Sequence, residues 1–214
     1  MNCKTWVIKT FHYFCAINNT GFLALLIVKN LWDNEAVANL LLFNLGSTIA
    51  YWTIGITLLG ESKISKTFKN IFTPSLIVLF LALFLVVTGI NANIPGMVYK
   101  VAESGGNIAL PLMLILIGAV LYPFPRINDV RDLAYLSVTR LILLPCISVF
   151  IINLLPLDYD IKKIIYVAAL MPAGVTASIL TRKYGGDPDF ASKGSVITTI
   201  CSIITIPIGL SLLL

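Results

Sequence analysis

The stretch Ala168-Ala-Leu-Met-Pro-Ala-Gly-Val-Thr-Ala-Ser-Ile-Leu-Thr181 is apolar, as a membrane-spanning helix is, but it carries Pro172 and Gly174 near its middle. Proline has no backbone N–H and crowds the carbonyl four residues before it, while glycine makes non-helical conformations accessible. A spanning helix keeps its backbone hydrogen bonds internal because lipid offers no other partner. We therefore predict a broken helix here, whose freed backbone groups are satisfied by protein, water or a ligand.

The composition of the whole chain indicates a membrane protein. Of its 214 residues, 58% are hydrophobic and only 12% are charged, which is too apolar for a soluble domain of this size. The net charge of +5 comes from basic residues spread over loops, so it does not indicate a nucleic-acid partner. The expected fold class is an all-α polytopic membrane protein surrounded by the lipid bilayer.

Seven apolar runs are long enough to cross a hydrocarbon core, which takes roughly 20 residues. The expected spans cover residues 11–31, 36–59, 74–92, 106–123, 134–156, 162–183 and 192–213. Basic residues concentrate in alternate loops, which is typical of the cytoplasmic side. Ten of the 15 lie on that side, namely Lys4, Lys9, Lys63, Lys66, Lys69, Arg126, Arg131, Arg182, Lys183 and Lys193. We expect a multi-pass protein of the cell membrane with its N-terminus inside and its C-terminus outside.

Two pairs of similar segments recur at nearly the same distance along the chain. Asn19-Thr-Gly-Phe-Leu-Ala resembles Pro172-Ala-Gly-Val-Thr-Ala, 153 residues later. Thr53-Ile-Gly55-Ile-Thr-Leu-Leu resembles Pro207-Ile-Gly209-Leu-Ser-Leu-Leu, 154 residues later. Five spans separate the members of each pair, and because five is odd, the two copies would cross the membrane in opposite directions. Many secondary transporters are built from such inverted repeats.

The repeat connects the predicted break with a polar segment in the first span, where Asn18, Asn19 and Thr20 precede Gly21. Polar side chains within spans often hydrogen-bond one helix to another. Alternatively, they belong to an unwound stretch that binds a solute, an interpretation that the inverted counterpart at Met171–Gly174 favours. Two crossing broken helices would each present a half-helix N-terminus suited to a carboxylate, while the exposed carbonyls at the other ends could hold a cation or a proton carrier.

Two further polar residues are candidates, each with two interpretations. Arg140 lies about two turns into the fifth span, where its side chain either snorkels to the interface or serves as the partner of an anionic substrate. Asn107 either forms the first turn of the fourth span or lines a cavity. The full set of candidate substrate-binding residues is Asn18, Asn19, Thr20, Gly21, Asn107, Met171, Pro172, Ala173, Gly174 and Thr176, with Arg140 as a possible anion partner.

Signatures of an enzyme are missing from the sequence. The spans hold no set of His, Asp and Glu residues such as an intramembrane protease needs, and there is no GxSxG, HExxH or P-loop motif. The four cysteines (Cys3, Cys15, Cys146 and Cys201) lack the spacing of a metal site. We therefore expect neither an enzyme nor a cofactor or metal.

The same segments resemble the auxin efflux carrier family, the PIN-like carriers that include bacterial malate- and malonate-type permeases. The matching pieces are Phe14-Cys-Ala-Ile-Asn-Asn-Thr-Gly-Phe-Leu23, the stretch Gly105–Gly118 with Ala109-Leu-Pro-Leu, and Ala168–Ala191 with Met171-Pro-Ala-Gly and Lys183-Tyr-Gly-Gly-Asp187. The resemblance covers essentially the whole chain. It implies two inverted five-helix repeats with crossing broken helices, a homodimer, and a scaffold that includes the third and fourth spans.

The sequence departs from the family pattern in two places. The family would have three more spans before Met1, so residues 1–60 represent the last two helices of the first repeat. Residues 61–73 would then be a cytoplasmic loop, and residues 74–214 the whole second repeat. Second, Ala24 and Leu26 stand where the family has glycine and proline, which leaves Asn19 and Gly21 to break the first span.

These observations predict a secondary-active transporter of small organic anions, such as dicarboxylates or auxin-like carboxylates. It would work by alternating access around the two broken helices, with proton or cation coupling as a possibility. The alternative is a truncated or split fragment of such a carrier, without transport activity of its own.

Overall fold

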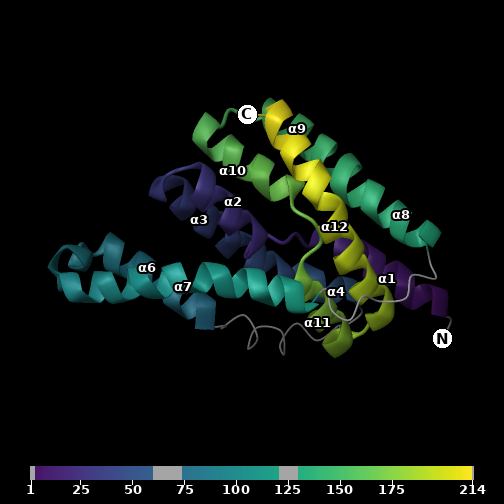
Figure 1. The fold of residues 1–214 in the computed structure, drawn as a ribbon, viewed down its shortest axis with the longest axis horizontal. Helices are drawn as coiled ribbons and strands as arrows, with labels where there is room; N and C mark the ends of the chain where they lie inside the picture. The colour runs from purple at the N-terminus through teal and green to yellow at the C-terminus, as the bar shows by residue number, and fades with distance from the viewer. Residues whose placement is uncertain (1–2, 60–73, 121–129, 214) are drawn as a thin grey trace.

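The computed structural model describes residues 3–59, 74–120 and 130–213 (Figure 1). Its regular elements are all helices, and the one bridge of β type joins two loops. The loop expected at 61–73, with Lys63, Lys66 and Lys69, lies outside the described residues, as does Arg126. Within the described ranges the expected all-α class is therefore confirmed.

The first two expected spans correspond to five helical segments. These are α1 (Cys3–Ala16), α2 (Leu23–Leu31), α3 (Asn34–Ala50), the π-helical turn η1 (Tyr51–Gly55) and α4 (Ile56–Leu59). The chain is not helical between α1 and α2, whereas α3, η1 and α4 form one continuous rod over Asn34–Leu59. The first span is thus broken although Ala24 and Leu26 replace the expected glycine and proline.

The remaining helices include a second broken span. They are α6 (Pro74–Val87), the 3-10 turn η2 (Ile90–Asn93), α7 (Gly96–Val120), α8 (Val130–Val138), the π-helical turn η3 (Thr139–Leu143), α9 (Leu144–Leu154), α10 (Tyr159–Leu170), α11 (Val175–Tyr184) and α12 (Pro188–Leu213). The rods Asn34–Leu59, Val130–Leu154 and Pro188–Leu213 are long and apolar enough to span a membrane. A shorter apolar helix covers Leu76–Val87. These rods support a multi-pass membrane protein.

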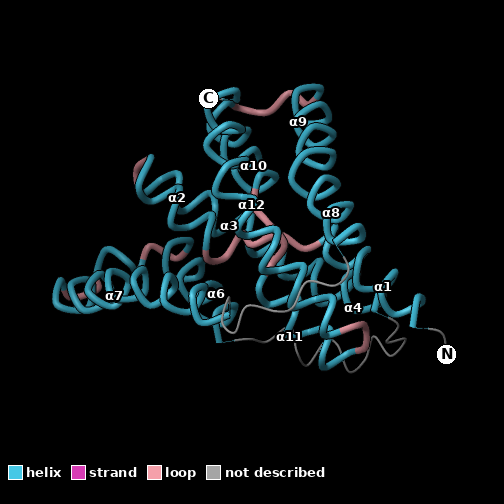
Figure 2. The backbone as a smooth tube through the Cα atoms, turned by 45° about the vertical axis from the view of Figure 1, so that its right-hand side comes forward, coloured by secondary structure: helices cyan, strands magenta, loops and turns pink. Residues whose placement is uncertain are grey.

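Helices α6 and α7, in teal, reach out to the left in Figure 1 and again in the turned view of Figure 2. Helix α7 begins at Gly96, ten residues before the start expected at 106. Nearly all of its described side chains are exposed. The residues expected at the start of the fourth span, Asn107 among them, therefore lie in the interior of α7.

Short-range hydrogen bonds explain where two of the rods begin. Asp33 caps α3, because its Oδ1 accepts from the N–H of Ala36 at 3.0 Å. The chain between α11 and α12 turns at Gly185 and Gly186, whose φ angles of 102° and 122° favour glycine. Asp187 then caps α12, since its Oδ1 accepts from the N–H groups of Asp189 and Phe190 at 3.0 Å each.

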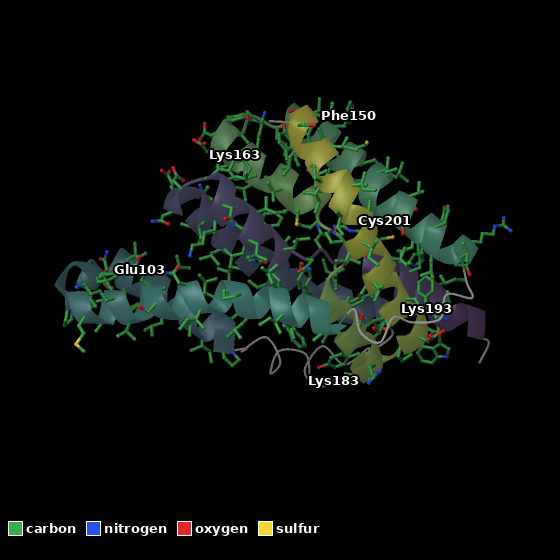
Figure 3. All side chains as sticks on the ribbon, in the orientation of Figure 1. Glu103, Phe150, Lys163, Lys183, Lys193 and Cys201 are labelled. Atoms are coloured by element: carbon green, nitrogen blue, oxygen red, sulfur yellow. The ribbon has the colours of Figure 1, made fainter. Side chains whose placement is uncertain are left out.

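The buried core is divided into two apolar clusters by the two broken helices. One cluster joins α1 and α11 with α8 and α12, and its members include Tyr13, Phe14, Leu136, Ala177 and Phe190. The other joins α2 and α10 with α3 and α12, and it includes Ala24, Val28, Leu40, Val167 and Met171. Each cluster thus holds one half of each broken helix. Lys163 near the start of α10 and Lys183 near the end of α11 lie at opposite ends of the molecule, as the halves of one span should (Figure 3).

Candidate functional site

The two breaks meet and hydrogen-bond to each other. The N–H of Asn19 donates to the carbonyl of Pro172 at 2.9 Å, and the N–H of Gly174 donates to the carbonyl of Ile17 at 3.1 Å. Asn18 and Ala173 thereby form an isolated antiparallel bridge. The segment Asn18–Gly21 and the segment Met171–Gly174 are thus brought together at one point, which we call the crossing.

Close approach of the two backbones requires glycine at position 174. A Cβ added to Gly174 would lie 3.2 Å from the carbonyl oxygen of Asn18 and 3.2 Å from Cγ2 of Ile17. Such contacts are tighter than a packed interior tolerates without movement. By contrast, a Cβ on Gly21 would have nothing within 4 Å. The two glycines of the repeat therefore have different roles, because only Gly174 is confined.

Side chains from α3 and η1 hold the first break. The hydroxyl of Tyr51 donates to the carbonyl of Asn18 at 2.9 Å, and Nδ2 of Asn44 donates to the carbonyl of Thr20 at 3.0 Å. In return, the hydroxyl of Thr20 donates to Oδ1 of Asn44 at 2.7 Å. Asn44 and Tyr51 were not among the predicted site residues, although a signal was present: they lie seven residues apart, which puts them on one face of a helix two turns apart.

The side chain of Asn18 ties the first break to the second broken helix. Its Nδ2 donates to the carbonyl of Ala168 at 2.8 Å, in the last turn of α10. The same carbonyl accepts from the N–H of Met171 at the end of α10 only at 3.4 Å, so the shorter bond to it comes from Asn18. Asn18 therefore contributes both its backbone and its side chain to the crossing.

Arg140 lies at the crossing and not at the membrane interface, so the snorkelling interpretation is wrong. Only 3% of its surface is exposed. Its Nη2 donates to the carbonyl of Met171 at 2.9 Å, and its Nη1 donates to the carbonyl of Cys15 at 3.3 Å. Cys15 lies in the last turn of α1, and Met171 follows the last residue of α10. One cation thus serves the C-terminal, partially negative ends of both broken helices.

Two buried N–H donors at the crossing have no hydrogen-bond partner among the described residues. They are Nε of Arg140 and Nδ2 of Asn19. The N-termini of α2 and α11, which carry partial positive charge, follow directly after the crossing. None of the acidic residues within 3–59, 74–120 and 130–213 is buried. The described part of the chain therefore offers no buried carboxylate to these donors and helix ends.

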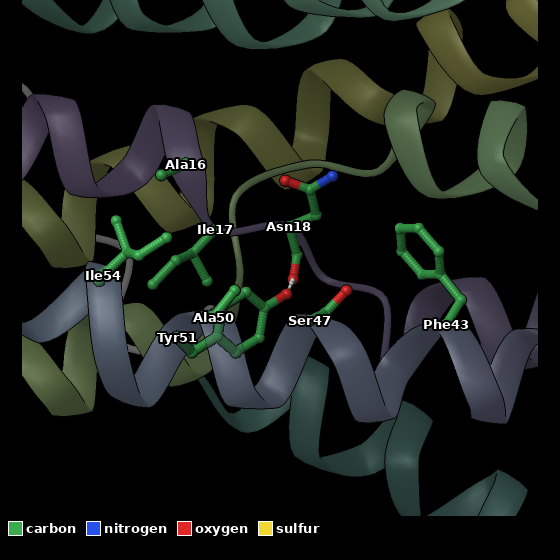
Figure 4. A pocket seen from close by; sticks show the side chains of 9 residues that line it. Ala16, Ile17, Asn18, Phe43, Ser47, Ala50, Tyr51 and Ile54 are labelled. Atoms are coloured by element: carbon green, nitrogen blue, oxygen red, sulfur yellow. Dashed lines mark hydrogen bonds between the residues drawn. The ribbon is translucent and has the colours of Figure 1, made fainter. Parts of the chain in front are cut away.

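A cavity of about 310 Å³ lies beside the first break (Figure 4). Ile17, Phe43 and Ile54 give it an apolar wall, and Asn18, Ser47 and Tyr51 are its polar lining residues. The bond from Tyr51 to the Asn18 carbonyl crosses one side of this space. The cavity is large enough for a small organic molecule with an apolar body.

Two of the predicted site residues are not shown to join the crossing. Asn107 is exposed on α7, where its Oδ1 accepts from Nζ of Lys29 at 2.9 Å. It therefore lies in the interior of α7 and not in a first turn, whereas its assignment to the substrate site stays a prediction. Thr176 lies in the first turn of α11, close to the crossing in sequence, but its side chain lies outside what the structure describes.

The second pair of similar segments makes equivalent contacts in the two halves of the structure. A Cβ on Gly55 would lie 3.0 Å from Cε2 of Tyr13 and 3.3 Å from Cδ1 of Ile17, at the end of α1. A Cβ on Gly209 would clash with Cδ2 of Leu170, at the end of α10. In both halves, a glycine on the rod that follows the broken helix packs against a side chain next to the break, Ile17 in one half and Leu170 in the other. The sequence repeat therefore corresponds to a repeated packing contact.

Comparisons with known proteins give the family of the chain. The sequence pattern of the family described as "Membrane transport protein" matches residues 59–210. An "Uncharacterized transporter" of Methanothermobacter thermautotrophicus is 25% identical over 211 residues, which cover 96% of this chain and 67% of the relative. A second uncharacterized transporter, from Methanocaldococcus jannaschii, is 24% identical over 195 residues, which cover 89% of this chain and 63% of the relative. No solved structure matched the chain.

The chain thus spans about two thirds of the length of the curated relatives that it matches. The family match covers most of the residues, including the second broken helix, Arg140 and the rod α12. The motifs at Asn18–Leu23 and Ala168–Ala191 had indicated the same family. Because both lines of evidence agree, the chain belongs to the membrane transport protein family, the auxin efflux carrier family that its motifs resemble.

Proposed function

We propose that the chain is the substrate-carrying part of a secondary-active transporter for small organic anions, and that the crossing is its binding site. The observation that carries this proposal is the charge arrangement at the crossing. Two buried donors, on Asn19 and Arg140, have no partner within the described part of the chain, and none of the acidic residues there is buried beside them. N–H donors without an acceptor favour a ligand that brings acceptor oxygens.

The charge balance favours a single carboxylate at the crossing. Each helix end carries about half an elementary charge. Arg140 therefore offsets roughly both C-terminal ends, those of α1 and α10, and leaves the two N-terminal ends of α2 and α11 with about one positive charge in total. One carboxylate group would neutralise that remainder, and its oxygens can accept from backbone and side-chain donors.

The packing suggests which parts would move together. Both broken helices are joined by backbone hydrogen bonds and by Arg140, so they form one unit with the rods that surround them. Helices α6 and α7 extend away from this unit (Figure 1) and would belong to the scaffold. Movement of the crossing unit against such a scaffold would expose the site to each side in turn.

The orientation that we propose follows from the distribution of basic residues, with the N-terminus inside the cell and the C-terminus outside, in the cell membrane. The family resemblance implies a homodimer, and we propose that a proton or cation gradient drives it. The chain would be a transporter and not an enzyme. A second possibility is that it transports only together with further helices, since its relatives are longer than the matched region.

Reconstitution of the purified chain in liposomes tests the proposal. Radiolabelled malate and, separately, radiolabelled indole-3-acetate serve as probes under an inward proton or sodium gradient. We expect saturable uptake of at least one probe, reduced by Asn19→Ala and by Pro172→Ala. Uptake that both substitutions leave intact would remove the site from the crossing. No uptake by the chain alone, followed by uptake after co-expression with the N-terminal third of a longer relative, would favour the second possibility.

A further inference from the structure

The two breaks at the crossing are made in different ways. The second contains Pro172, which lacks an N–H and so cannot continue an α-helix. The first contains no proline, and none of its residues has a positive φ, Gly21 included. Asparagine, threonine and glycine lower helix propensity, but a single glycine is often tolerated within a helix. The sequence of the first break therefore does not by itself enforce an interruption.

We infer that Asn44 and Tyr51 hold the first break open in place of a proline, as positioning residues for the crossing. In a continuous helix the carbonyl of Asn18 would accept from the N–H of Phe22, and that of Thr20 from the N–H of Ala24. Instead, the carbonyl of Asn18 accepts from Tyr51 at 2.9 Å and that of Thr20 from Asn44 at 3.0 Å.

The amide of Ala24 shows the same displacement. It donates to the carbonyl of Asn19 at 3.4 Å, five residues back, and not to Thr20. Buried backbone groups need partners, so a break persists only if other groups take over the freed carbonyls. The side chains of α3 and η1 supply both replacement donors, one for the carbonyl of Asn18 and one for that of Thr20.

The rod that carries Asn44 and Tyr51 is well placed to hold the break. The two residues share one helix face, and the π-helical turn η1 begins at Tyr51 itself. Such turns change the direction in which the following side chains point. A Cβ added to Gly55, in the same turn, would come closer to Tyr13 and Ile17 than ordinary van der Waals contact, so this rod packs closely against the end of α1.

The chain contains one Asn-Thr dipeptide, Asn19-Thr20, which allows a direct measurement. Labelling with 13C-carbonyl asparagine and 15N-threonine selects the Asn19 carbonyl in solid-state NMR of the full chain in liposomes. Its chemical shift reports whether the peptide is helical. We expect a non-helical shift in the natural chain, a helical shift in Asn44→Leu, and a partial change in Tyr51→Phe.

Matched controls separate this effect from a general loss of structure. Asn39→Leu changes another asparagine of α3, and Tyr135→Phe removes a hydroxyl from an exposed tyrosine of α8. Both should leave the shift unchanged. Leu23→Pro places proline at the first residue of α2, as Pro74 and Pro188 begin α6 and α12. Combined with Asn44→Leu, it should restore the non-helical shift.

The transport readout rests on the proposed function, whereas the NMR readout needs no substrate, so the two can fail separately. Uptake should fall roughly tenfold in Asn44→Leu and recover in the double variant with Leu23→Pro. An Asn19 shift that stays non-helical in both Asn44→Leu and Tyr51→Phe would overturn the inference. A loss of folding in Asn44→Leu that Leu23→Pro does not repair would overturn it too, because the defect would then not be rewinding of the break.

Discussion

The guanidinium of Arg140 donates to the carbonyl of Met171 at 2.9 Å, one residue before the proline that breaks the sixth span. The same side chain reaches the carbonyl of Cys15 in the other broken helix. A residue on a third rod, Val130–Leu154, therefore connects both breaks. Because the side chain is buried and charged, its loss would affect both the stability of the crossing and the binding of an anion.

Replacing Arg140 should show these two effects separately. Arg140→Leu removes both hydrogen bonds, each of about 1.5–3 kcal/mol for a charged donor, and should lower the thermal unfolding temperature in detergent by several degrees. Arg140→Lys keeps the charge but loses the planar fork, so it should retain more of the anion affinity than of the stability. Thermal unfolding and the KM for uptake measure the two effects.

Arg182→Leu is the matched control for this pair, since Arg182 is exposed in the last turn of α11. It should change the free energy of unfolding by less than about 0.5 kcal/mol, as surface substitutions generally do, and so leave the unfolding temperature almost unchanged. An Arg140→Leu variant as stable and as active as Arg182→Leu would contradict the role of Arg140 at the crossing.

Gly174→Ala and Gly21→Ala form a second matched pair. The first places a methyl group 3.2 Å from the Asn18 carbonyl oxygen, so the two backbones must separate, which should cost about 1–3 kcal/mol of stability and most of the uptake. The second places its methyl group where nothing lies within 4 Å, so uptake should be retained. Thermal unfolding and initial uptake rates check both, and equal effects at the two positions would refute the close approach.

The break at Pro172 could be predicted because its cause is local, and the repeat then pointed to Asn18–Gly21 as its counterpart. The direction in which Arg140 points could not be predicted. A buried Arg140 side chain differs from a snorkelling one by its hydrogen bonds to Cys15 and Met171. These residues are distant from Arg140 in sequence, and only the tertiary structure brings them near it. The family pattern of glycine and proline also pointed away from the first break. There, the interruption depends on Asn44 and Tyr51, which lie on another rod.

Asn107 was included among the substrate-binding residues because it is a polar residue in an apolar run. It is exposed and bound to Lys29, away from the crossing. Asn107→Ala should therefore leave the KM and the maximal rate of uptake unchanged, because an exposed hydrogen bond to lysine contributes little. Uptake kinetics beside Asn19→Ala check this. A loss in Asn107→Ala as large as in Asn19→Ala would return α7 to the substrate site.

The sign of the charge at the crossing can be tested at Asn19. Asn19→Ala removes one unpartnered donor and should weaken the binding of an anionic probe several-fold. Asn19→Asp also removes the donor but adds a carboxylate that competes for the positive helix ends, so it should weaken binding more than alanine does. Asn39→Asp, on the partly exposed side of α3, controls for the added charge. If Asn19→Asp instead bound the anionic probe as well as Asn19→Ala, the crossing would not be an anion site. Uptake of a cationic probe at the same rate by the natural chain and by Asn19→Asp would lead to the same conclusion. The opposite result, with Asn19→Asp the weakest of the three variants, would tie anion binding to the positive ends of α2 and α11.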